Sequence, residues 1–249
     1  MNAEEIDSSE VKRTVASFMP SSDILLFTGG IMYGALAQLQ DILRALENNG
    51  NENVYVLMGT SGGNPHEAFQ MMQLLHCYYK HVNVVLLGGC YSAGTLFALG
   101  AHKILMSQIA NLGPLDIQMR REDDISRMSG ECYRQALSDI SIVAQRVFID
   151  LFARLKSKRD MLISTQTASH AAGDIAKGLL APITQQIEPT RLGEMMRSQR
   201  IGISYSIRLM RRTYDLNKAR QIAETLARDY PSHDTVIDFE EASRNRFAC

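Results

Sequence analysis

Short apolar runs alternate with amphipathic segments along the first half of the chain. The runs predict buried strands, and the segments between them carry the spacing of helices that bury one face. Strands are predicted at 23–30, in the first part of 53–63 ahead of its glycine turn, at 82–90 and at 102–107, and helices at 33–50, 64–81 and 92–101. Because continuous apolar strands that alternate with helices are typical of parallel sheets, we expect a parallel sheet covered on both faces.

The first of these helices shows the pattern clearly. Its apolar residues recur at helical spacing, and Gly50 is a typical stop signal at its end. The residues expected on its buried face are Leu36, Leu39, Ile42, Leu43 and Leu46.

The second half of the chain has a different character. From 125 to 228 there is little strand pattern and several helical patterns, notably at 132–158 and 216–230, with Pro182, Pro189 and Pro231 as punctuation. No low-complexity linker or fixed repeat divides it. We therefore expect a single domain over 1–249, made of a polar extension (1–22), an α/β core (23–124), a helical layer packed on it (125–230) and a C-terminal segment (231–249).

Composition narrows the class of protein. The 249 residues are 45% hydrophobic, with a formal net charge of -1, so nothing favours nucleic acid or an anionic membrane surface as a partner. The long apolar stretch at 84–101 contains four glycines and fits a strand followed by a helix better than a membrane span. The polar, acidic start of the chain is not a signal peptide.

The cysteines point in the same direction. Four of them are scattered without a C-x-x-C pair, which fits neither a disulfide framework nor a zinc site (Cys77, Cys90, Cys132, Cys249). Such usage suits a reducing compartment, so we expect a cytoplasmic protein without a metal.

Two glycine-rich turns carry the candidate chemistry. They read GTSGGN at 59–64 and GGCYSAGT at 88–95, and each follows a predicted strand, so they should meet at one edge of the sheet. Ser92 stands where a helix begins, and free backbone N–H groups there stabilise a negative oxygen. A serine nucleophile beside two converging amides is the minimum for acyl transfer.

A purely structural reading of the same turns stays open, because strand–helix turns need glycine for positive φ. The G-x-S-x-G nucleophile motif is not satisfied, since Cys90 occupies its first glycine position. Neither turn matches the phosphate-binding patterns of P-loops or dinucleotide sites.

Taken together, four segments resemble the Clp-protease/crotonase superfamily. They are SGG at 61–63, YSAGT at 91–95, LGPLDIQ at 112–118 and SHDTVIDFEEA at 232–242. Within the superfamily, the chain is most similar to the serine dehydrogenase proteinase family, which is related to signal peptide peptidase A. The resemblance implies an α/β fold with a Clp/crotonase-like parallel β-sheet spiral core, helices on both faces and an added helical layer in the second half.

The resemblance also implies roles for particular residues. Ser92 matches the nucleophile, and Gly63 and Ala93 match the positions whose N–H groups form the oxyanion hole. The substrate groove is expected to include Gly62, Asn64, Pro114 and Asp116. Asp116 has a second interpretation, as a residue that caps a helix or orients a base.

The general base is where the sequence departs from the family. The Clp subunit has a histidine about 25 residues after its serine, whereas 113–116 here read Gly-Pro-Leu-Asp. Our first candidate is His233, whose pKa range suits a base, next to Asp234 at the place of the Clp aspartate. On an extended strand these two neighbours would face opposite ways. A surface role for His233 stays open.

A serine–lysine dyad is the alternative, and it needs a desolvated lysine. Lys177, in an apolar stretch, is the better candidate, whereas Lys156 and Lys158 belong to a charged helix end. Of the other histidines, His102 is expected to be structural, His66 to start a helix or line the groove, and His170 has no specific case.

The resulting hypothesis is a serine peptidase that acts on peptide or protein substrates without a cofactor. It would form a homo-oligomer, a trimer or a multiple of three, with no nucleic-acid or membrane partner. Two alternatives are a crotonase-like acyl-CoA enzyme, which does not need Ser92, and a catalytically silent scaffold or partner-binding protein.

Overall fold

The computed structural model describes residues 21–46, 50–115, 118–120, 127–157, 163–230, 232, 234–245 and 247, without side chains at 118–120, 127–136, 191 and 195. It divides into two compact units, one comprising Met1–Ile117 and Gln199–Cys249, the other Gln118–Ser198. The sequence predicts a single domain with a helical layer packed on its core. The division arises because the long helices of the second unit pack on each other.

A parallel sheet forms the centre of the first unit. Its strands follow the order β1 (Ser22–Thr28), β2 (Asn53–Thr60), β3 (His81–Cys90) and β4 (Lys103–Met106). A short fifth strand, β5 (Asn111–Leu112), also runs parallel to β3 and pairs with its last two residues, beyond the part that pairs with β4. The predicted parallel sheet is confirmed.

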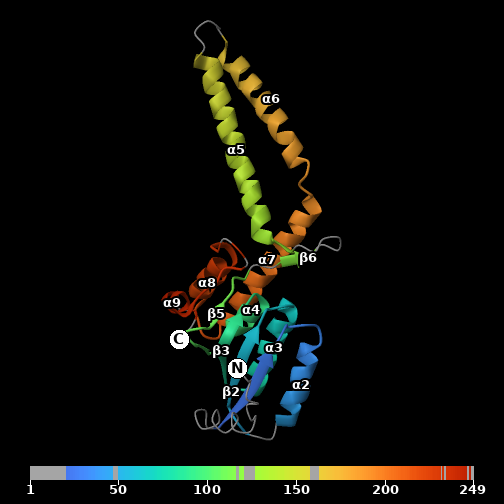
Figure 1. The fold of residues 1–249 in the computed structure, drawn as a ribbon, viewed down its shortest axis with the longest axis vertical. Coiled ribbons are helices and arrows are strands. Elements are labelled where there is room, and N and C mark those ends of the chain that lie inside the picture. The colour runs from blue at the N-terminus through green and yellow to red at the C-terminus, as the bar shows by residue number, and fades with distance from the viewer. Residues whose placement is uncertain are drawn as a thin grey trace, which may run out of the picture. The chain divides into compact units, whose positions relative to one another are not determined.

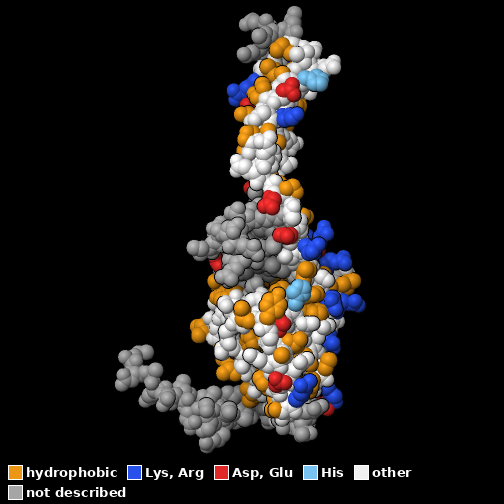
Figure 2. Space-filling view, turned by 90° about the vertical axis from the view of Figure 1, so that its right-hand side faces the viewer, with side chains coloured by type: hydrophobic (Ala, Val, Ile, Leu, Met, Phe, Trp, Pro, Cys, Tyr) orange, Lys and Arg blue, Asp and Glu red, His pale blue; other side chains and the backbone are white. Residues whose placement is uncertain are grey.

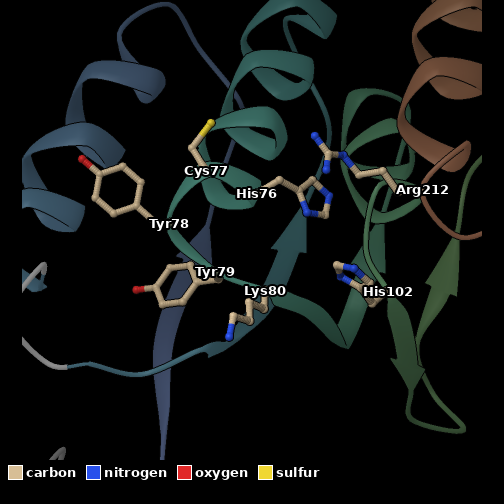
Figure 3. Close-up of a pocket in the computed structure, with 7 residues that line it drawn as sticks. All are labelled: His76, Cys77, Tyr78, Tyr79, Lys80, His102 and Arg212. Carbon is tan, nitrogen blue, oxygen red and sulfur yellow. The ribbon is translucent and has the colours of Figure 1, made fainter.

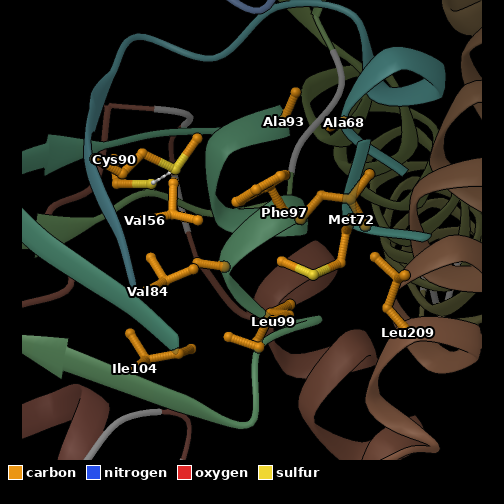
Figure 4. Packing of buried hydrophobic residues seen from close by; sticks show 14 of the residues in the cluster. Val56, Ala68, Met72, Val84, Cys90, Ala93, Phe97, Leu99, Ile104 and Leu209 are labelled. Atoms are coloured by element: carbon orange, nitrogen blue, oxygen red, sulfur yellow. Dashed lines mark hydrogen bonds between the residues drawn. The ribbon is translucent and has the colours of Figure 1, made fainter. Parts of the chain in front are cut away.

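Helices flank the sheet on both sides, as the alternating pattern predicts (Figure 1). Those that follow the first three strands are α2 (Ala35–Leu46), α3 (Pro65–Tyr78) and α4 (Ala93–Ala98). Strand residues of alternate position are fully or almost fully buried in the core, namely Val54, Val56, Met58, Val82, Val84 and Leu86. Figure 4 shows Met72, Phe97 and Leu209, from three different helices, packed together in this core.

On α2 the buried face is narrower than the sequence predicts. Leu39 and Leu43 are buried, but Ile42 is 47% exposed. An amphipathic pattern fixes the side of the helix that faces the core, not how far the neighbouring element covers it.

The C-terminal elements complete the first unit. They are the second half of α7 (Pro189–Met210), then α8 (Leu216–Arg228) and α9 (Phe239–Arg244). Between α8 and α9, Ile237 pairs with Leu112 of β5, each N–H donating to the other's carbonyl at 2.9 Å. The segment before α9 is thereby held beside the edge of the sheet.

The second unit is a helical pair with a small hairpin. Strands β6 (Gln118–Arg120) and β7 (Arg127–Ser129) are antiparallel, and the helices are α5 (Gly130–Ser157) and α6 (Thr165–Thr184). Three-residue strands are too short to show an alternating pattern, which is why the sequence did not predict the hairpin. Pro182 lies inside the end of α6, and Pro189 begins α7.

Candidate active site

Ser92 adopts a rare backbone conformation at the turn from β3 to α4. Its φ is 53° and its ψ is −113°, and among the described residues Ser21 is the only other non-glycine residue with positive φ. For a residue with a side chain such a conformation costs of order 1–3 kcal/mol and persists only where its surroundings enforce it. Serine nucleophiles on strained strand–helix turns have their hydroxyl exposed in this way.

Two threonines provide that enforcement. Thr95, fully buried, places its hydroxyl 3.0 Å from the Cys90 carbonyl and 2.8 Å from the Gly113 carbonyl. The Thr60 carbonyl accepts from the Tyr91 N–H at 3.0 Å. The backbone on each side of Ser92 is thus tied to a neighbouring strand.

The glycine turn after β2 is held against the Ser92 turn. The Gly62 N–H donates to Thr60 Oγ1 at 3.0 Å, and Gly62 has a φ of +92°. A Cβ on Gly62 would lie 2.9 Å from Ser92 Cβ and 3.3 Å from the Ala93 nitrogen. No side chain fits there, so the contact between the two turns requires glycine.

Gly63 is constrained on its other side. Its φ is +142°, and a Cβ there would lie 2.2 Å from the Ile31 carbonyl oxygen. Ile31 also donates to the Gly62 carbonyl and accepts from the Asn64 N–H. The loop after β1 therefore fixes the turn in which the Gly63 N–H is presented.

Two amides of the site have no acceptor among the described residues. Within the part of the chain that the structure describes, neither the Gly63 N–H nor the Ala93 N–H donates a hydrogen bond. Gly63 is exposed, whereas Ala93 is buried at the start of α4, where helix N–H groups have no partner within the helix. Two unpaired donors beside a serine hydroxyl are suited to stabilise a developing oxyanion.

Cys90 is not a competing nucleophile. It is fully buried in the core close to Met58, and burial raises the pKa of its thiol to about 12. At neutral pH it stays protonated, and only a thiolate is strongly nucleophilic.

The same residue explains how the turn forms without the full nucleophile motif. The Cys90 side chain points into the core, 4.0 Å from Met58 Sδ, so a glycine is not required there. Gly94 is required, because a Cβ on it would lie 2.3 Å from Thr60 Cγ2 and 2.9 Å from Cys90 Sγ.

The expected groove residues have different environments. Gly62 is buried where its turn packs against the Ser92 turn, and Pro114 is buried in the segment that follows β5. Asn64 is the N-cap of α3, where its side chain accepts from the His66 and Glu67 N–H groups. Asp116 lies outside the described residues.

The base candidates differ in whether the structure describes them. His233 and Lys158 lie outside the described residues. Asp234 is exposed, with its N–H donating to Ser232 Oγ, and the Thr235 N–H donates to the Ser232 carbonyl, so Asp234 lies at a turn and not on the extended strand that we expected.

Both described lysine candidates belong to the second unit. Lys177 is exposed on α6, in contrast to the apolar surroundings that the sequence suggested, because it lies on the solvent side of an amphipathic helix. Lys156 is exposed near the end of α5, and its ammonium donates to the Ile163 carbonyl.

Three other histidines have local roles. His102 accepts the Val82 N–H at Nδ1, which agrees with the structural role expected for it. His66, in the first turn of α3, makes a 3.0 Å hydrogen bond between Nδ1 and the Tyr205 hydroxyl. His170 is exposed on α6.

Thr60 and Thr95 were not predicted from the sequence as supports of the site. A signal was present, because each threonine adjoins a glycine turn in the sequence, within GTSGG and SAGT. The sequence does not reveal their contacts, which join Thr95 to Gly113 after β5 and Thr60 to Tyr91 after β3.

A recess of about 470 Å³ lies at the opposite edge of the sheet from Ser92, around the end of α3 and the starts of β3 and β4 (Figure 3). It is lined by His76, Cys77, Tyr78, Tyr79, Lys80, His102 and Arg212. Burial lowers the pKa of both His76 and His102, and the charge of Arg212 lowers them further. Because its residues lie at the opposite edge of the sheet from Ser92, the recess is separate from the candidate active site.

Within the described ranges, no cluster of histidine, cysteine or carboxylate side chains could hold a metal ion. No helix in the same ranges combines the length and apolarity needed to cross a bilayer.

Comparison with known proteins identifies the fold. No protein-family profile and no curated sequence matches the chain. Among solved structures, it is similar to the membrane-bound stomatin-specific protease 1510-N in a serine-to-alanine mutant, with a TM-score of 0.53 at 14% identity over 91% of this chain and 77% of that one. A lysine-to-alanine mutant of 1510-N in complex with a substrate peptide gives the same score and identity over 91% and 73%.

A third similar structure is a ClpP1 mutant from Listeria monocytogenes, with a TM-score of 0.47 at 14% identity over 96% of this chain and 93% of that one. At such an identity the likeness to the stomatin-specific protease shows that the two chains share a fold.

Proposed function

We propose that the protein is a serine peptidase that hydrolyses peptide or protein substrates through an acyl-enzyme on Ser92, without a cofactor. The observation that carries this proposal is the strained Ser92 turn, packed against Gly62 and flanked by the unpaired N–H groups of Gly63 and Ala93. The protein shares its fold with a protease, which also supports peptide hydrolysis as its reaction.

In the reaction, Ser92 Oγ attacks the scissile carbonyl carbon as the base removes the hydroxyl proton. The carbonyl oxygen becomes an oxyanion and accepts from the Gly63 and Ala93 N–H groups. The base then protonates the departing amine, and water releases the acyl group by the reverse proton route.

We assign the base to His233, with Asp234 beside it, and retain Lys177 as the alternative. Two contacts support a base from this segment. Ile237, shortly after His233 in the chain, pairs with Leu112, and the Gly113 N–H donates to the carbonyl of Cys90, two residues before Ser92. The 1510-N mutants, one lacking a serine and the other a lysine, favour testing a lysine as well.

We also propose a cytoplasmic homo-oligomer, a trimer or a multiple of three. A row of exposed apolar side chains at helical spacing on α6 supports self-association, since Ile175 is 45%, Leu179 60% and Ile183 49% exposed.

The test is labelling with a fluorophosphonate, which reacts with activated serines. The wild type should be labelled, and Ser92→Ala should lose labelling and peptide hydrolysis while keeping its circular dichroism spectrum. A wild type that resists labelling would leave the scaffold or the crotonase-like enzyme. Hydrolysis that persists in Ser92→Ala would exclude Ser92 as the nucleophile.

A further inference from the structure

The exposed side of α7 in the first unit carries a row of arginines. Arg200 and Arg208 are exposed on the same side of the helix as Ser204. Arg211 extends the row, because its N–H still donates to the Ile207 carbonyl in helical fashion. The opposite side of the helix is buried. We call Arg200, Arg208 and Arg211 the arginine face.

The described residues provide no partner for the positive charge of the arginine face. Among the described residues, no carboxylate pairs with any of the three arginines, whereas Arg44 pairs with Asp41 and Arg154 with Asp150 on their own helices. The whole chain has a formal net charge of -1, so the excess is local. Figure 2 shows Lys and Arg side chains gathered along one margin of the molecule.

Arg208 is held in position by aromatic rings. Its guanidinium carbon lies 4.5 Å from the centroid of the Phe69 ring and 5.7 Å from that of Tyr205. These two rings stack on each other, with centroids 4.2 Å apart. Because the side chain is already ordered, less rotamer entropy is lost when an anion binds to it.

The arginine face runs along α3, which begins just after the Gly63 turn. Tyr205 lies between Ser204 and Arg208 on the helix, and its hydroxyl bonds to His66. His66 belongs to the first turn of α3, whose N-cap, Asn64, directly follows Gly63. A peptide bound across the Gly63 turn therefore meets the arginine face near Tyr205, and Arg211, the neighbour of Arg212 in the recess, lies toward the opposite edge of the sheet.

We propose that the arginine face binds acidic segments of peptide substrates and so selects substrates that carry glutamate and aspartate several residues away from the cleaved bond. This inference rests on the proposed peptidase function for its consequence, but not for binding itself. From Arg200 to Arg211 the helix rises roughly 16 Å, which matches about five residues of extended chain. Guanidinium groups bind carboxylates through paired N–H donors.

The experiment measures binding separately from hydrolysis. The Ser92→Ala variant is titrated into a fluorescein-labelled oligopeptide rich in glutamate, or into its glutamine counterpart, and anisotropy is recorded at low and high salt. We expect tight binding of the glutamate peptide that weakens with salt. Replacing all three arginines by glutamine should weaken it on the order of tenfold, since one exposed ion pair contributes up to a factor of about five.

Controls separate charge from folding. Arg44→Gln removes the same charge on α2 and should leave binding unchanged. Arg200→Gln alone leaves the Phe69 stack intact and should give a partial loss. Equal binding of the two peptides, or unchanged binding in the triple variant, would overturn the proposal. Preferred binding of the glutamate peptide without its hydrolysis by the wild type would instead overturn the peptidase function.

Discussion

Ser92 carries its hydroxyl on a backbone conformation that suits glycine better than serine. The contacts made by Thr60 and Thr95 hold the turn in place despite that cost. The Ser92 side chain makes no capping hydrogen bond to α4, so no such bond offsets the strain of its backbone.

The strain leads to a prediction about stability. Ser92→Gly should raise the free energy of unfolding by about 1 kcal/mol, because glycine adopts positive φ without steric conflict. Ser92→Ala, which keeps the conflict, is the matched control. Urea denaturation of the three proteins measures the effect, and a glycine variant less stable than the alanine variant would argue against strain at this turn.

The base is the second question at this scale. If His233 is the base, His233→Ala should slow hydrolysis by about 10²–10⁴-fold, and wild-type activity should fall as pH drops below the pKa of the imidazole. Lys177→Ala should then have no effect. Wild-type kinetics in His233→Ala, together with a loss in Lys177→Ala, would transfer the role to the lysine.

At the scale of elements, the sequence predicted the first half well. Each strand and helix from β1 to β4 follows from apolar runs and glycine stops, because both signals are local. The division into two units has no signal in the local pattern, since it depends on how the neighbouring helices α5 and α6 pack on each other. That Gly62 lies close to Ser92 could be expected only from the geometry of a parallel sheet. The supports provided by Thr60 and Thr95 could not be predicted, because they depend on contacts between strands.

The joint between β3 and α4 gives a prediction of its own. Thr95→Val keeps the shape of a fully buried side chain but removes the hydroxyl that lies between the Cys90 and Gly113 carbonyls. We expect a loss of about 1–3 kcal/mol in unfolding free energy and a lower kcat. Thr95→Ser keeps the hydroxyl and should retain kcat; if both variants lose kcat equally, the hydroxyl is not the cause.

At the scale of the whole molecule, the histidine recess makes stability depend on pH. Burial, with the nearby charges of Arg212 and His81, lowers the pKa of His102 below its ordinary value, and the pKa of His76 is also lowered by burial. The unfolded chain therefore binds protons first as pH falls, so stability should be full above about pH 6.5 and decline below it.

Thermal unfolding between neutral and mildly acidic pH measures this decline. His76→Gln should flatten the curve, whereas His170→Gln, at an exposed position on α6, should not. An unchanged slope in His76→Gln would show that other groups govern the acid side.

Assembly is the second property at this scale. If the apolar row on α6 is an interface, Leu179→Glu should dissociate the oligomer into smaller species in sedimentation velocity, because a carboxylate would be buried there. The exposed Gln185→Glu change, just after the helix, is the control. A wild type that sediments as a monomer would contradict the proposed assembly.

The two glycines opposite Ser92 also limit how this sequence can drift. Every amino acid that one nucleotide change can introduce in place of glycine carries a Cβ, and a Cβ at Gly62 or Gly63 would meet backbone atoms of Tyr91 or Ile31 at 2.6 Å or less. Neither position has a mutational neighbour that preserves the turn. In descendants of this gene, the pair should therefore persist through silent codon changes alone for as long as selection maintains the site, and its replacement would mark a lineage in which that selection has ended.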